Sequence, residues 1–174
     1  LSSLKKLDLS SNRLKSIRER IGMLHSLEDL SLHDNQITSL PDTIGSLSSL
    51  KTLRLSSNKL ASIPASIGML HSLEELNLKF NKLISLPEGI GSLFSLKHLL
   101  LSDNALTSLP DTIGSLVSLQ EICLLGNRMA SLPGSIVRLR ALTAIGLESV
   151  SEISLPTKSA VDFLYSILKS KSVD

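Results

Sequence analysis

The stretch LEELNLKFNKLISLPEGIGSLFS, residues 73–95, recurs along almost the whole chain at a fixed period of 23 residues. One period later the sequence reads LKHLLLSDNALTSLPDTIGSLVS, and one period earlier it reads LKTLRLSSNKLASIPASIGMLHS. Self-similarity at a fixed period is the signature of a repeat architecture, in which like units stack on one another. The asparagine at position nine of the unit recurs as Asn12, Asn35, Asn58, Asn81, Asn104 and Asn127.

The unit L-x-x-L-x-L-x-x-N-x-L-x-x-L-P-x-x-I-G-x-L-x-x resembles the leucine-rich repeat. More narrowly, it is similar to the 23-residue intracellular class found in Ras-group scaffold proteins and in some bacterial proteins. The resemblance implies an α/β solenoid shaped as a right-handed horseshoe, with a parallel sheet on its concave face and short turns or 3₁₀ segments on its convex face. It also implies that the six asparagines form a buried ladder that satisfies backbone groups of the loops.

The pattern inside one unit agrees with this architecture. Within residues 27–32, Leu30 and Leu32 alternate with polar neighbours, which is typical of a strand with one buried face. Asn35 then favours a turn, because its side chain bonds nearby backbone groups. Pro41 excludes a further ladder strand, and too few residues remain before the next unit for more than a short helical turn. We expect one domain over residues 1–174, with about seven repeats in 1–156.

Both ends depart from the regular unit. Residues 1–4 repeat the junction between units at residues 47–50, so the chain starts inside a repeat and we expect a piece of a longer array. Near the other end, Val150 replaces the asparagine and Glu152 replaces a core leucine. A helix is then predicted over about 157–170, with Ser159 and Asp162 resembling a capping box. This helix either closes the end of the core or docks a partner. Its apolar face comprises Ala160, Val161, Leu164, Ile167 and Leu168.

Composition narrows the range of functions. Aromatic residues make up 2% of the chain, so the core must be aliphatic. The formal charge of +2 gives no electrostatic case for nucleic acid, whose binders usually have a clear basic excess. No apolar run is long enough to insert through a membrane. Cys123 is the only cysteine, which rules out an internal disulfide and favours a reducing compartment, so we expect a cytoplasmic location.

Equivalent residues of stacked units lie side by side, roughly 4.8 Å apart in a parallel sheet. Rows across the sheet can therefore be read from the sequence. Position two of successive units alternates in charge, which predicts ion pairs that support the register. The row is Lys5, Glu28, Lys51, Glu74, Lys97 and Gln120.

The outward positions of the sheet, which we take as three, five, seven and eight, are free to vary and are the expected binding surface. Phe80, Leu100 and Leu125 are the expected anchors, because a solvent-facing leucine gains nothing unless a partner covers it. Scattered surface leucines are also common, and this is the competing interpretation. The partner-binding candidates are Asp29, Ser31, His33, Arg54, Asn77, Lys79, Phe80, His98, Leu100, Glu121, Cys123 and Leu125.

Two groups of polar residues resemble a metal site and a catalytic site, but each lacks features that such a site requires. Glu75, His98 and Glu121 form a row with metal-ligand side chains, yet on an open sheet a histidine paired with acidic neighbours is the better interpretation. Ser10 and His33 are lateral neighbours, but an open sheet supplies neither an oriented base nor an oxyanion hole. We expect no catalytic residue, no metal and no cofactor.

The sequence thus predicts a non-enzymatic domain that binds a protein or peptide on its concave face, in the manner of an intracellular signalling scaffold. One alternative is the substrate-recognition arm of a larger enzyme, such as a kinase, a GTPase or a ubiquitin ligase. Another is a structural, self-associating array, because the ends of a solenoid expose core leucines. We expect a monomer or weak end-to-end association.

Overall fold

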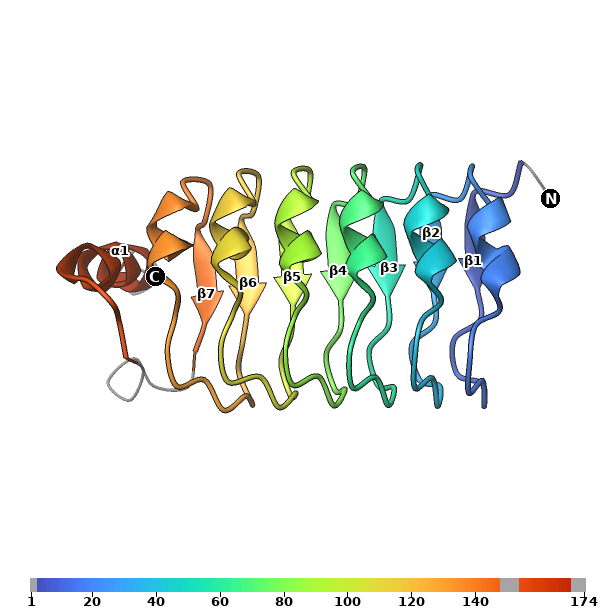
Figure 1. Cartoon of the computed structure of the whole chain (residues 1–174), viewed down its shortest axis with the longest axis horizontal. Helices are drawn as coiled ribbons and strands as arrows, with labels where there is room; N and C mark the ends of the chain where they lie inside the picture. Colours follow the sequence, from blue (N-terminus) through green and yellow to red (C-terminus); the bar gives the residue numbers. More distant parts are fainter. Residues whose placement is uncertain (1–2, 148–153, 170–174) are drawn as a thin grey trace.

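The computed structural model describes residues 3–147 and 154–169. Seven strands form one parallel sheet in which each strand pairs with its neighbours in sequence, so strand order follows the chain (Figure 1). Each strand covers positions three to five of its repeat. The register is one repeat per strand, as in the pairing of Leu53 with Leu76. The strands are β1 (Lys6–Asp8), β2 (Asp29–Ser31), β3 (Thr52–Arg54), β4 (Glu75–Asn77), β5 (His98–Leu100), β6 (Glu121–Cys123) and β7 (Ala144–Gly146).

A second layer of short 3₁₀ helices stacks alongside the sheet (Figure 1). Five of the six follow a proline in an extended conformation, which ends the loop and leads into the helix. Arg18 adopts nearly the same backbone angles before the first helix, so repeat one keeps its shape without the proline. The helices are η1 (Glu19–Met23), η2 (Asp42–Ser46), η3 (Ala65–Met69), η4 (Glu88–Ser92), η5 (Asp111–Ser115) and η6 (Gly134–Arg138).

Glycine at position nineteen lets the 3₁₀ helices approach one another closely. A Cβ atom at Gly68 would lie 2.3 Å from the carbonyl oxygen of Gly89 in the next helix, and the same clash recurs along the stack. In the sixth repeat this position is Val137, and the next element there is the C-terminal helix, which packs on η6. The change from glycine to valine therefore marks where the stacking of 3₁₀ helices ends.

The core between the two layers is aliphatic, as the composition predicts. Leucines at positions four and six, such as Leu76 and Leu78, are fully buried, and so is the isoleucine of each central 3₁₀ helix, such as Ile90. These rows of like side chains run continuously from one repeat to the next. Each repeat thus supplies one slice of a shared core.

The asparagines join neighbouring repeats through their loops. Asn81 Oδ1 accepts a hydrogen bond from the Leu60 N–H at 3.0 Å, and its Nδ2 donates to the carbonyl oxygens of Leu55 at 2.9 Å and Leu78 at 3.1 Å. Asn35, Asn58, Asn104 and Asn127 make the equivalent bonds. Asn12 differs, because it is exposed and bonds only to carbonyls of its own repeat in the part of the chain that is described.

The C-terminal helix α1 (Lys158–Lys169) closes the far end of the stack, as one of the two interpretations predicts (Figure 1). Ala160, Leu164 and Ile167 are buried where the helix packs on η6 and β7. The predicted capping box is wrong by two residues: the Ala160 N–H donates to Thr157 Oγ1 at 3.2 Å, so Thr157 caps the helix. Val150, Glu152 and the side chain of Leu168 lie outside the described residues.

Among the residues described, no helix combines the length and apolar character that crossing a bilayer requires.

Candidate functional site

The sheet presents positions three and five of each repeat outward, but the prediction that positions seven and eight are also outward strand positions is wrong. Each strand ends at position five, and position eight adopts a left-handed backbone in six successive repeats, with φ between 54° and 67°. The row consists of Ser11, Asp34, Ser57, Phe80, Asp103 and Gly126. Small and acidic residues tolerate this geometry. The enrichment of the row in serine, aspartate and glycine is a signal in the sequence that could have revealed the turn.

Phe80 is the exception in this row. Its φ is 55°, a conformation that costs about 1–2 kcal/mol for a residue with a Cβ and is rare for a bulky one. Its ring is nevertheless 57% exposed, so burial in the described structure does not offset this strain. Strained backbone that the rest of the fold imposes is often found at binding sites. The folding and packing of the domain therefore explain neither the strained backbone of Phe80 nor the exposure of its side chain.

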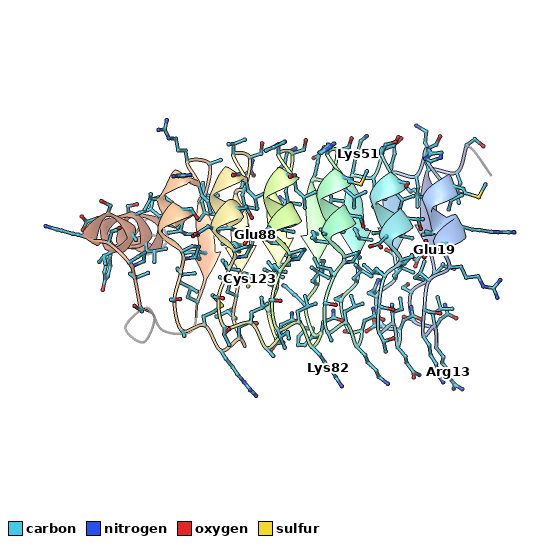
Figure 2. All side chains as sticks on the ribbon, viewed as in Figure 1. Arg13, Glu19, Lys51, Lys82, Glu88 and Cys123 are labelled. Carbon is cyan, nitrogen blue, oxygen red and sulfur yellow. The ribbon has the colours of Figure 1, made fainter. Side chains whose placement is uncertain are left out.

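Leu100, Cys123 and Leu125 form the neighbouring part of the surface. Leu100 and Cys123 are partners in register on β5 and β6 and are half-buried, whereas Leu125 is 43% exposed. A Cβ atom at Gly146 would lie 2.9 Å from Cys123 Sγ and 3.5 Å from Leu125 Cγ, so both side chains gather over that glycine. Cys123, labelled in Figure 2, also lies 2.9 Å from Ser102 Oγ. We call Phe80, Leu100, Cys123 and Leu125 the apolar patch.

The N-terminal half of the sheet face is occupied by ion pairs. Arg54 Nη1 lies 2.9 Å from Asp29 Oδ1, and Arg54 Nε lies 3.5 Å from Glu75 Oε1, so one guanidinium bridges three strands. Ser31, one of the partner-binding candidates predicted from the sequence, is only 8% exposed in the domain. It lies in register between Asp8 and Arg54 on the two neighbouring strands.

The position-two row forms ion pairs, which confirms that prediction. Glu28 lies between Lys5 at 2.8 Å and Lys51 at 2.7 Å, and Lys97 lies 2.6 Å from Glu74. Hydrogen bonds from Lys5 and Lys51 lower the pKa of Glu28 from 4.5 to about 2. The Lys97 bond likewise lowers the pKa of Glu74, and the Glu28 bond raises the pKa of Lys51. Lys51 lies at the edge opposite to Arg13 and Lys82 (Figure 2).

The serine and histidine of the N-terminal half are not paired with each other. Ser10 Oγ donates to Asp8 Oδ1 at 2.6 Å, and this bond lowers the pKa of Asp8. His33 Nε2 lies 3.9 Å from Asp34, and its Nδ1 is buried without a hydrogen-bond partner in the described structure. No Ser–His contact of the kind that activates a nucleophile is formed by these side chains.

The Glu75, His98 and Glu121 row is divided between two partnerships. His98 Nδ1 lies 3.3 Å from Glu121 Oε2, while Glu75 is held by Arg54. Within residues 3–147 and 154–169, no group of three or more His, Cys, Asp or Glu side chains is arranged to hold a metal ion. Between the two halves of the face, Asn77 Oδ1 accepts the Lys79 N–H at 3.2 Å, and both side chains are half-buried.

Reasoning from the sequence missed a second exposed surface beside the 3₁₀ helices. Phe94 and Val117 are exposed there at equivalent positions of repeats four and five. The signal was available, because large apolar side chains occur at this position only in those two repeats.

Comparisons with known proteins agree with the architecture. A family model described as a leucine-rich repeat region matches residues 1–87, which is half of the chain, and a second one, described as a leucine rich repeat, matches residues 71–129. No curated protein matches the chain significantly.

Several solved structures are similar. A leucine-rich repeat protein of Leptospira interrogans is 35% identical with a TM-score of 0.68, and the match covers 94% of this chain and 47% of that protein. The plant peptide hormone receptor RGFR1, solved in complex with RGF2, is 31% identical with a TM-score of 0.78, over 89% of this chain and 25% of the receptor. The leucine-rich repeat domain of the type III effector XopL is 27% identical with a TM-score of 0.79, over 87% of this chain and 55% of that one.

The chain therefore spans about half the length, or less, of the similar structures. Domains with this fold commonly serve as protein-interaction modules and are generally not enzymes themselves. One assignment follows from the family match, the 23-residue period, the single parallel sheet and the asparagine bonds between repeats: the chain belongs to the leucine-rich repeat proteins.

Proposed function

We propose that this chain is a non-enzymatic recognition domain that binds a protein or peptide on its sheet face, in the manner of a signalling scaffold. The observation that carries the proposal is Phe80, whose ring is exposed on a left-handed turn that five other repeats fill with serine, aspartate or glycine. A partner that covered this ring would gain the burial that the free domain does not provide. The complex of RGFR1 with RGF2 is consistent with peptide recognition by a related fold.

The two halves of the sheet face have different roles in this proposal. The apolar patch supplies the anchors, because a few buried large side chains dominate most interfaces. Arg54, His98 and Glu121 form ion pairs on the same sheet face and orient the partner through charge rather than through burial. Asp29 and Lys79 extend the polar rim.

The test compares variants that copy chemistry already present in other repeats. Phe80→Ser reproduces Ser57, and Leu125→Ser reproduces Ser102, so the double variant keeps a backbone geometry that the fold accepts. Ile84→Thr is the matched control, because it removes an exposed apolar side chain from a loop position that is threonine in two other repeats.

Tagged wild-type and variant domains would be used to capture proteins from lysate, with identification by mass spectrometry and circular dichroism to verify folding. We expect at least one protein to be enriched by the wild type and by Ile84→Thr but lost with Phe80→Ser/Leu125→Ser. Recovery of the same proteins by all three would refute the sheet face as the binding surface. An alternative, in which the domain selects substrates for an enzyme elsewhere in a longer chain, predicts that the captured protein is modified by that enzyme.

A further inference from the structure

The edge of the 3₁₀ layer carries a second surface with a regular construction. After each of the helices η2 to η6 the chain makes a tight turn in which the N–H at position twenty-two donates to the carbonyl at position twenty. The bond measures 3.0 Å from Phe94 to Ser92, 2.9 Å from Val117 to Ser115, and 2.8 Å from Arg140 to Arg138. Side chains at these two positions therefore lie on the same turn, and successive turns stack beside one another.

The composition of this edge changes halfway along the stack. In the first three repeats, positions twenty and twenty-two carry only methionine, serine and histidine. In repeats four, five and six, position twenty-two is phenylalanine, valine and arginine in turn. Position twenty is serine in repeats four and five and arginine in repeat six. The two rows are Met23, Ser46, Met69, Ser92, Ser115, Arg138 and His25, Ser48, His71, Phe94, Val117, Arg140.

This C-terminal part of the edge is hollowed into an open depression of about 790 Å³. Phe94 and Val117, which are 52% and 61% exposed, line it together with Val137, Arg138 and Arg140. Gly114 and Ser115 complete its lining. Depressions of this size, apolar with a few convergent polar groups, are typical of binding sites. We call this feature the edge groove.

The charge of the edge groove selects its occupant. Its lining contains two arginines and no carboxylate. Neither guanidinium takes part in an ion pair within residues 3–147 and 154–169, in contrast to Arg54 on the sheet face. Arginine forms its strongest pairs with carboxylates in a bidentate geometry. The groove therefore offers an apolar surface next to two guanidinium groups that form no ion pair with any described residue.

We propose that the edge groove binds an extended peptide segment of a partner protein in which an apolar side chain and an acidic side chain are separated by one residue. Strands of neighbouring repeats are roughly 5 Å apart in the sheet, and alternate side chains of an extended chain point the same way about 6.5–7 Å apart. An apolar side chain packed on Phe94 and Val117 therefore places a carboxylate two residues on at Arg138 and Arg140. The groove and the apolar patch lie on different layers, so this proposal does not rest on the sheet-face function.

The probes are two pools of short synthetic peptides, acetylated and amidated to remove the terminal charges. In the first pool a leucine, isoleucine or phenylalanine stands two residues before a glutamate. The second pool differs only in having lysine in place of the glutamate. Binding would be followed through the methyl resonances of Val117 and Val137 in NMR titrations. We expect the acidic pool to shift these resonances and the lysine pool to leave them unchanged.

Charge reversal provides the decisive comparison. Arg138→Glu/Arg140→Glu should lose at least about 10-fold in affinity for the acidic pool and gain binding of the lysine pool, because the pairing is restored with the signs exchanged. Phe94→Ser/Val117→Ser, which copies Ser48, should lose binding without any change in charge. Phe80→Ser/Leu125→Ser should bind like the wild type.

Two results would overturn the proposal. One is the absence of shifts at Val117 and Val137 with the acidic pool on the wild-type domain. The other is equal binding of the acidic pool by the wild type and by a charge-reversed variant that circular dichroism shows to be folded.

Discussion

Repeat one and repeat four have nearly the same pattern, but their surroundings give them different physical properties. Leu76 of repeat four is fully buried, whereas Leu7, at the same position of repeat one, is only half-buried. Asn81 bonds across to the preceding repeat, whereas the described bonds of Asn12 stay within its own repeat. The difference shows that a unit of this kind owes its core to its neighbours, since no single repeat can bury its own apolar face.

The asparagines should show the largest contrast. Asn81→Ala would leave the Leu60 N–H and the carbonyls of Leu55 and Leu78 without their buried partner. Each such group costs about 1–3 kcal/mol, so we expect a loss of about 4 kcal/mol in the free energy of unfolding. Asn12→Ala removes only exposed bonds and should cost less than about 1 kcal/mol. Urea denaturation of both variants measures the contrast, and equal losses would contradict it.

The core leucines should differ in the same direction. Leu76→Ala opens a cavity between two filled layers and should cost about 3 kcal/mol. Leu7→Ala removes a side chain that is already half in water, so we expect about half of that loss. The measurement is again the midpoint and slope of urea denaturation. A cost at Leu7 as large as that at Leu76 would mean that the first repeat is covered in solution, for example by a second copy of the chain.

A substitution in repeat four should also stabilise the domain. Phe80→Asn replaces a bulky residue at a positive φ with one that tolerates that conformation, so we expect a gain of about 1 kcal/mol. Ser11→Asn is the matched control in repeat one and should change stability by less than about 0.5 kcal/mol. Thermal denaturation can rank the two variants. Destabilisation by Phe80→Asn would show that the ring has a packing role and would contradict its proposed role in binding.

The smallest effect is expected at the ion pairs that link repeats one, two and three. The pKa of Glu28 is lowered from 4.5 to about 2, so its contribution to stability is fully present above about pH 4.5 and is lost as the pH falls towards 2. Glu28→Gln should therefore flatten the acid limb of the stability profile over that window. Glu88→Gln, at a glutamate for which the described structure shows no ion pair, is the control. Identical acid limbs for the wild type and Glu28→Gln would exclude this contribution.

Part of the binding surface could be predicted because the repeat fixes which positions face outward. Positions three and five were placed correctly, and the pairing of the position-two charges followed from the strict period of 23 residues. The positive φ at Phe80, the burial of Ser31 and the cap at Thr157 were not predicted. Each of these features depends on a local backbone angle or on the side chains of a neighbouring strand. The alternation of apolar and polar residues predicts only which face of the sheet a residue is on, so it contains no information about either.

The sequence by itself determined the stacking, the parallel sheet, the aliphatic core and the place of the C-terminal helix, because a strict repeat puts equivalent residues side by side whatever the details of each turn. Only the tertiary structure decided which exposed side chains have partners. Arg54 pairs with carboxylates on two neighbouring strands, whereas Arg138 and Arg140 line a groove whose described lining contains no carboxylate. Whether an arginine is paired depends on the distance between charged side chains of different repeats, because the energy of a charge pair depends on that distance. The order of residues in the chain does not give this distance.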